Sequence, residues 1–211
     1  MSNGTFDLMF KDTGGLLMRW LIPFGLVMVL VGSSQAEVVV YPAPPDEKLS
    51  DEYRVLIAGQ EVAVYTARTL DPPFAGKQWD YGGPYSFANF DTDEAVEVRI
   101  TSPRNLANTV IRPTYPDVTM RLVNEHEVII CLPGPRKISV EPEGKRGPLL
   151  LFANPLEKDR PKPDDPNVVF FGPGVHKPEK IVLGSQQTLY LAGGAVVKGG
   201  VLAQGDHIRI A

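Results

Sequence analysis

Short segments of alternating hydrophobic and polar residues dominate the chain after residue 36. The stretch Val96-Glu97-Val98-Arg99-Ile100 alternates strictly, which predicts a strand with one buried face and one wet face. We expect two hairpins, one around Gly59-Gln60 and one around residues 91–94. No stretch after residue 36 shows helical periodicity. The predicted strands are 53–58, 61–67, 85–90, 95–101, 109–112, 120–123, 128–132, 137–141 and 149–152. This density of short strands predicts an all-β fold, with an antiparallel β-sandwich over residues 37–155.

A repeat of about twenty residues begins at Val168. The segment VVFFGPGVHK (168–177) aligns with TLYLAGGAVVK (188–198), and the alignment pairs Phe170 with Tyr190 and Gly174 with Gly194. The same offset pairs 181–183 with 201–203, and 207–210 aligns with 188–191 one residue short of a further repeat. Leucine-rich repeats share this period, but their leucine–asparagine frame is absent. The pattern therefore predicts the first rungs of a parallel β-helix over residues 168–211, as the truncated start of a longer one.

Between the two predicted domains, residues 156–167 are rich in proline and charge. This composition predicts a stiff, extended linker. Asp164 and Asp165 could be a catalytic pair, but adjacent residues in an extended segment point to opposite sides. We therefore favour a solvated linker.

The N-terminal region has the layout of a secretory signal peptide. An apolar run from Trp20 to Gly32 follows Arg19 and precedes Ser33-Ser34-Gln35-Ala36, a small–x–small end. The run is too short to span a hydrocarbon core of about 30 Å, which disfavours an uncleaved anchor. We expect residues 1–36 to be a signal peptide with a possible start-site extension. The mature protein is then exported to the periplasm or the extracellular space and does not stay inserted in the membrane.

The charge of the chain and its reactive residues limit the classes of function and partner. The formal net charge is -4 and no basic block appears, which argues against nucleic acid as a partner. Cys131 is the single cysteine, and its apolar run predicts a buried free thiol. His126, His176 and His207 lack metal-ligand spacing, so we predict no metal and no cofactor.

An aromatic cluster supplies the candidate binding residues. Trp79, Tyr81, Tyr85 and Phe87 lie beside Gly82-Gly83-Pro84. Aromatic rings on loops can stack on sugars, which makes Trp79, Tyr81 and Tyr85 candidate carbohydrate-binding residues. The alternative is that Tyr85 and Phe87 point inward as strand core while Trp79 covers a sheet edge, and we favour it because most aromatic side chains serve as buried area.

Several strings resemble a known family. KISVEPEG (137–144), PLLLFANP (148–155) and NVVFFGPGVHKPEKIVLGSQQTLYLAGGAVVKGGV (167–201) resemble bacterial pectinase-type glycoside hydrolases of the polygalacturonase and dextranase kind, in glycoside hydrolase families 28 and 49. The upstream SFANFDTDEAVEVRIT (86–101) is similar to the β-sandwich that precedes their catalytic domain. Most of the chain after the signal peptide is covered, and Phe171-Gly172-Pro173-Gly174 is the most distinctive phrase.

The resemblance implies a right-handed parallel β-helix that hydrolyses a polysaccharide with inversion. In such enzymes, aspartates on middle rungs protonate the leaving oxygen and activate a water between them. Their aspartate-rich motifs and their Gly-His-Gly motif have no counterpart here, and Asp206-His207 matches neither. No catalytic residue is therefore carried over, and whether this chain is itself an enzyme stays open.

The sequence thus predicts the N-terminal portion of an exported polysaccharide-degrading glycoside hydrolase. Its partner would be a pectin-like or glucan-like polysaccharide, hydrolysed only by the full-length enzyme. The alternative is a non-catalytic exported module for carbohydrate binding or adhesion.

Overall fold

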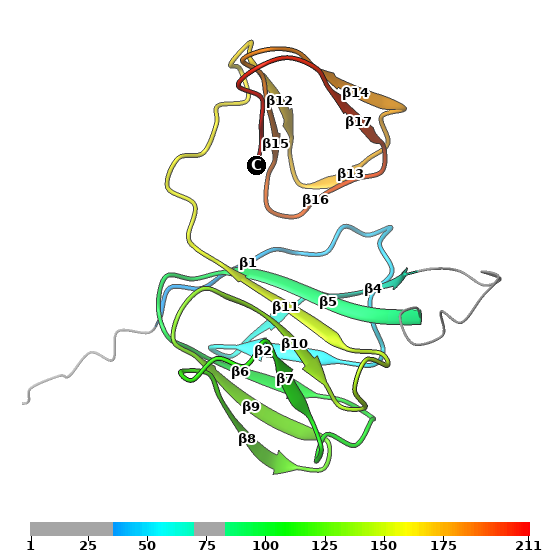
Figure 1. The fold of residues 1–211 in the computed structure, drawn as a ribbon, viewed down its shortest axis with the longest axis vertical. Helices are drawn as coiled ribbons and strands as arrows, with labels where there is room; N and C mark the ends of the chain where they lie inside the picture. The colour runs from blue at the N-terminus through cyan, green and yellow to red at the C-terminus, as the bar shows by residue number, and fades with distance from the viewer. Residues whose placement is uncertain (1–35, 70–82) are drawn as a thin grey trace, which may run out of the picture. The chain divides into compact units, whose positions relative to one another are not determined.

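The computed structural model describes residues 36–69 and 83–211, and these residues form strands, turns and loops (Figure 1). The predicted signal peptide lies outside the described residues except for Ala36. Within the two described ranges there is no helix, so none that could cross a membrane. The prediction of an all-β fold is confirmed.

Two sheets make the sandwich. The first, here called sheet A, runs in the order β1-β5-β11-β10-β7, with β4 pairing β5. The second, sheet B, runs β3-β2-β6-β9-β8. The strands of sheet A are β1 (Val39–Val40), β4 (Val64–Thr69), β5 (Gly83–Asp91), β7 (Val110–Arg112), β10 (Arg136–Glu141) and β11 (Leu149–Asn154). Those of sheet B are β2 (Arg54–Ile57), β3 (Gln60–Val62), β6 (Val96–Thr101), β8 (Thr119–Asn124) and β9 (Glu127–Leu132).

The sandwich core forms because each strand turns alternate residues inward. In β6, Val98 and Ile100 are fully buried, whereas Glu97 and Arg99 are exposed, as the sequence predicts. Valine, leucine and isoleucine from both sheets fill the space between them. Each such side chain contributes about 1.5–3 kcal/mol when fully buried, so the sandwich holds together without a disulfide among its described residues.

Two details of the predicted sandwich are wrong. Every described strand pair in it is antiparallel except β5 with β11, which run parallel. The predicted hairpin at residues 91–94 is absent, because β5 belongs to sheet A and β6 to sheet B. Thr92 is fully buried, and its backbone N–H donates to the carbonyl of Asn154 at 2.8 Å, which directs the chain from one sheet to the other. The hairpin at Gly59-Gln60 is confirmed as the β2–β3 pair.

Cys131 also differs from its prediction. It lies on β9, but its side chain is exposed and its Sγ is 4.0 Å from Glu97 Oε1. Val128, Ile130 and Leu132 are buried on the opposite face. The apolar run thus supplies both faces of the strand, and Cys131 falls on the outer one.

Residues 168–211 form the beginning of a parallel β-helix, as predicted. Three parallel ladders stack one coil on the next: β12 with β15 and β18, β13 with β16, and β14 with β17. Their bounds are β12 (Val168–Phe171), β13 (Gly174–His176), β14 (Lys180–Leu183), β15 (Thr188–Leu191), β16 (Ala195–Val197), β17 (Gly200–Ala203) and β18 (Arg209–Ile210). Ile181, Leu183 and Leu189 form the centre of its small apolar core.

The strand registers confirm the repeat and change the predicted alignment at its corners. Phe170 lies beside Tyr190, and the 181–183 segment lies beside 201–203, as predicted. Gly174 is in register with Ala195 instead of Gly194. In the third coil Leu189 lies beside Ile210, two residues from the predicted alignment. Since side chains alternate with a period of two, a two-residue shift keeps Ile210 on the core side.

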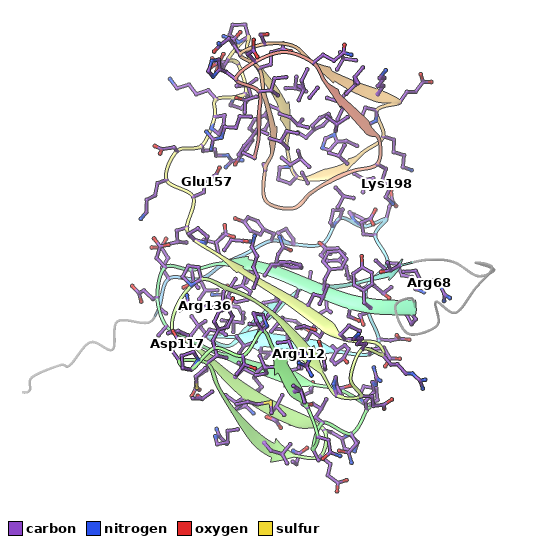
Figure 2. The ribbon with its side chains drawn as sticks, in the orientation of Figure 1. Arg68, Arg112, Asp117, Arg136, Glu157 and Lys198 are labelled. Atoms are coloured by element: carbon purple, nitrogen blue, oxygen red, sulfur yellow. The ribbon has the colours of Figure 1, made fainter. Side chains whose placement is uncertain are left out.

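The segment predicted as a linker, 156–167, contains no strand and is attached to both neighbouring parts. The Leu156 N–H donates to Asp93 Oδ1 at 3.0 Å, and Lys158 Nζ lies 3.1 Å from Asp93 Oδ2. Glu157, which Figure 2 labels on this segment, accepts a hydrogen bond from the Tyr190 hydroxyl. These contacts fix the path of an otherwise polar segment.

Candidate functional site

Of the three candidate sugar-binding residues, the structure describes only Tyr85. Trp79 and Tyr81 lie outside the described residues. Tyr85 and Phe87 are half-buried on the outer face of sheet A, whereas the alternating Ser86, Ala88 and Phe90 are buried. The favoured interpretation of Tyr85 and Phe87 as inward-pointing core is therefore wrong.

The burial of Ser86 explains how β5 can turn its larger rings outward. The Ser86 hydroxyl lies 2.7 Å from the Ser50 hydroxyl, and its N–H donates to the carbonyl of Pro148 at 2.9 Å. A buried serine is tolerated because both of its polar groups are paired. The inner face of β5 therefore accepts Ser86, and Tyr85 and Phe87 are left on the outer face.

Cross-strand neighbours extend the aromatic surface on both sides of Phe87. Tyr65 on β4 is in register with Phe87, and their rings are nearly parallel, with centroids 5.2 Å apart and an interplanar angle of 23°. Tyr85 lies on the other side, with its ring 6.2 Å from that of Phe87. On β11, Leu150 is in register with Phe87, and Phe152 follows two residues later on the same face. We call Tyr65, Tyr85, Phe87, Leu150 and Phe152 the aromatic face of sheet A.

Part of this face lies in an open hollow of about 500 Å³. Its described lining comprises Thr69, Gly83, Pro84, Tyr85, Phe87, Lys145, Pro148, Leu150 and Phe152. Aromatic and aliphatic groups form the floor, and Thr69 and Lys145 supply polar atoms at its margin. A mostly apolar concave surface with few polar groups is the usual composition of a small-molecule site.

The charged groups around the hollow differ from those of a catalytic cleft. Lys145 is the one charged side chain in its described lining, and no described carboxylate lines it. At the edge of the aromatic face, burial, followed by the charge of Glu47, raises the pKa of the Tyr65 phenol. This phenol therefore stays protonated at neutral pH and can donate a hydrogen bond. Because its described lining holds no carboxylate that could act as a general acid or base, this part of the surface is suited to binding.

The most buried carboxylates of the sandwich are engaged in structural contacts. Asp91 accepts hydrogen bonds from the Tyr41 hydroxyl and from Asn154 Nδ2, and burial together with the Asp91 bond raises the pKa of Tyr41. Glu141 pairs with Arg112, whose Nε is 3.1 Å from Glu141 Oε2. Each carboxylate thus has a fixed partner and holds strand ends in place.

A further ion pair of the sandwich joins Arg136 and Asp117, which are both labelled in Figure 2. Arg136 Nη2 donates to Asp117 Oδ2 at 2.7 Å, and the Arg136 guanidinium lies 5.4 Å from the centre of the Tyr115 ring. This contact joins β10 to the loop before β8.

The remaining residues considered for chemistry make local contacts. Asp165 Oδ1 accepts from the Asn167 N–H at 2.9 Å in the turn before β12, which matches the structural interpretation of that residue. His176 Nε2 lies 2.7 Å from the carbonyl of Gly172, and His126 Nδ1 lies 3.1 Å from that of Arg104. In the part of the chain that the structure describes, no three His, Cys, Asp or Glu residues are grouped to hold a metal ion.

Fold and sequence together define a class of architecture: a β-sandwich followed by the first coils of a parallel β-helix. No family model matches the sequence, and no curated protein matches it.

Among solved structures, the chain is similar to Dex49A from Penicillium minioluteum. The TM-score is 0.51 at 18% sequence identity, and the match covers 79% of this chain and 47% of Dex49A. The chain therefore spans about half the length of that protein. At this identity the similarity establishes the shared β-helix fold.

Proposed function

We propose that this chain provides the sandwich and the first coils of a polysaccharide-degrading glycoside hydrolase. The observation that carries the proposal is the joint match of sandwich and coils to Dex49A, a glycoside hydrolase with a β-helix fold. The matched 79% of the chain is more than either part could supply alone. The same combination is what the sequence strings at 86–101 and 137–201 resemble.

In this proposal the coils described here are a foundation for catalytic coils. Stacked β-strands hold side chains on rigid elements, and inverting hydrolysis needs two carboxyl groups fixed about 6.5–9.5 Å apart around a water. The most buried described carboxylates of the sandwich, Asp91 and Glu141, have fixed structural partners, and none of the described carboxylates lines the hollow. The hydrolytic aspartates are therefore proposed to belong to further coils of the full-length enzyme.

The test is an assay of the protein made from its complete reading frame. We expect it to release reducing sugars from dextran or from polygalacturonate and the product anomer to show inversion by NMR. The 211-residue chain assayed alone should release none. A folded full-length protein that hydrolyses neither polymer, or hydrolysis by the 211-residue chain alone, would count against the proposal.

We also propose that the protein is exported through cleavage after Ala36. The apolar run at 20–32 and its small-residue end support this, since they have the layout that a signal peptidase reads. Expression with the natural N-terminus should yield an extracytoplasmic protein whose first residue is Glu37. Retention of residues 1–36 in the mature protein would contradict it.

The alternative, a non-catalytic sugar-binding or adhesion module, keeps one supporting observation. Tyr85 is on an outer, half-buried surface beside other rings, where a ligand can reach it. Binding in the absence of hydrolysis by the full-length protein would favour this alternative.

A further inference from the structure

We propose that the aromatic face of sheet A is a binding site for a neutral polysaccharide, separate from any catalytic centre. The proposal concerns a surface of the sandwich and does not depend on the hydrolase assignment. Its central residues are Tyr85, Phe87 and Phe152. Of these only Tyr85 was a sequence candidate.

Ring geometry is the first argument for a sugar ligand. Tyr85 and Phe87 are both half-buried on the outer face, with ring centroids 6.2 Å apart and an interplanar angle of 37°. Tyr65 is buried and its ring is stacked on that of Phe87, with centroids 5.2 Å apart, so it supports the Phe87 ring and does not itself face a ligand. The C–H groups on one face of a pyranose ring carry partial positive charge, and an aromatic face carries partial negative charge, so the two attract. Tyr85 and Phe87 can provide such contacts to neighbouring sugars.

Polar groups at the margins are the second argument. Thr69 lies at one end of the hollow. Outside its lining, Asn89 and Asn154 lie on the outer side of β5 and β11 near Phe152, and the Asn154 amide also donates to Asp91. Hydroxyl and amide groups can both donate to and accept from sugar hydroxyls. An aromatic floor with hydroxyl and amide margins matches the two-sided chemistry of a sugar, which is apolar on its ring faces and polar on its rim.

Charge decides between neutral and acidic polysaccharides. Lys145 is the single charged side chain in the described lining of the hollow, and that lining includes no arginine to hold carboxylates in pairs. A uronic-acid polymer would bring one negative charge per sugar to a chain whose net charge is already -4. The surface is therefore complementary to an uncharged chain of sugars.

The aromatic face could alternatively be packing surface for another part of the protein. Exchange of a ring for leucine separates the two roles. Leucine keeps most of the apolar volume, so a packing surface tolerates it, but it removes the ring face on which a sugar would stack. Tyr85→Phe keeps the ring, and Phe170→Leu makes the same exchange at a half-buried ring on β12, outside this face.

The experiment is affinity electrophoresis of the 211-residue chain in native gels containing dextran or polygalacturonate. We expect retardation by dextran. Tyr85→Leu, Phe87→Leu and Phe152→Leu should each weaken it about fivefold to tenfold, while Tyr85→Phe and Phe170→Leu bind as the wild type does. Melting temperatures of the leucine variants should stay within about 5 °C of the wild type.

Three results would overturn the proposal. One is a folded wild-type chain that dextran does not retard, whatever the variants do. Another is undiminished retardation of folded Tyr85→Leu and Phe152→Leu proteins. The third is retention by polygalacturonate with none by dextran. If the full-length protein hydrolyses the polysaccharide but this chain does not bind it, the proposed binding site is contradicted and the proposed function is not.

Discussion

Gly147, just before β11, lies where two distant segments of the sandwich meet. Its backbone is left-handed, with φ +56°, and a Cβ there would overlap Nη1 of Arg104. That guanidinium donates to the carbonyls of Gly147 at 2.8 Å and Arg146 at 3.1 Å, and the Tyr53 hydroxyl donates to the same Gly147 carbonyl at 2.6 Å. Gly147→Ala should therefore destabilise the chain by about 2–4 kcal/mol, from the strained backbone and the displaced hydrogen bonds. Urea unfolding measures this loss in the free energy of unfolding.

Gly144 provides the matched control for Gly147. It is also left-handed, with φ +60°, but nothing lies within 4 Å of its Cβ position. Gly144→Ala should show the backbone strain alone, about 1–2 kcal/mol. Adding Arg104→Ala to Gly147→Ala should cost little more, because the guanidinium contacts are already lost. Equal losses from the two alanine variants would show that Arg104 contributes nothing at this turn.

A second prediction at the residue scale concerns pH. Burial, followed by the hydrogen bond to Glu157, raises the pKa of the Tyr190 phenol to about 12, against about 10 in an unfolded chain. Between these values the unfolded state has lost a proton that the folded state keeps, so stability falls as pH rises from 10 to 12. Tyr190→Phe should lose less stability between pH 9 and 11 than the wild type does. Identical losses, by urea midpoint, would mean that this phenol does not titrate with folding.

Among the elements, the turn between β16 and β17 depends on a close approach between coils. A Cβ at Gly199 would overlap the carbonyl oxygen of Pro178 in the coil below, whereas nothing lies within 4 Å of the Cβ position at Gly200. Because the obstacle is backbone, it cannot move as a side chain does. Gly199→Ala should destabilise the coils by about 1–3 kcal/mol, and Gly200→Ala should change little. Hydrogen exchange of residues 195–203 reports the difference, and equal protection in both variants would refute the close approach.

The strands also show which side-chain orientations the sequence pattern predicts and which it does not. Strict alternation predicted the faces of β6 correctly, because its outward residues are charged. It failed for β5, where the sequence Tyr85-Ser86-Phe87 has an aromatic ring on each side of one small polar residue. Only the contact of Ser86 with Ser50, 36 residues away, shows which side is inner. Sequence alone does not supply such a long-range partner.

The absence of long-range partners from the sequence pattern also explains why part of the aromatic face was not predicted. Tyr65 and Phe152 join Phe87 only through the β4–β5 and β5–β11 registers, and the second of these is a parallel pairing that an antiparallel sandwich does not predict. In the β-helix, by contrast, partners are one repeat apart and the sequence shows them directly. Its alignment failed only at corners, where residues such as His207, with φ +56°, change the coil length.

At the scale of the whole molecule, the last strands of the β-helix expose residues that correspond to buried ones in the coil before. Val201 is in register with Ile181 and Ile210 with Leu189, yet Val201 is 47% and Ile210 is 62% exposed, against 5% and 2% for their partners. Stacking of the next coil covers such residues in the earlier coils. Apolar side chains and unpaired strand edges left uncovered are a template for association.

We therefore expect the 211-residue chain, purified alone, to self-associate through this surface. Size-exclusion chromatography with light scattering at tens of micromolar should show oligomers, and Val201→Lys with Ile210→Lys should shift them to monomer, because burying an unpaired charge is costly. Val182→Lys is the matched control: Val182 is 59% exposed but lies on the outward side of β14, between the buried Ile181 and Leu183. It should leave the oligomers unchanged. A monomeric wild-type chain, or dissociation by Val182→Lys to the same extent, would show that the uncovered coil is not the associating surface.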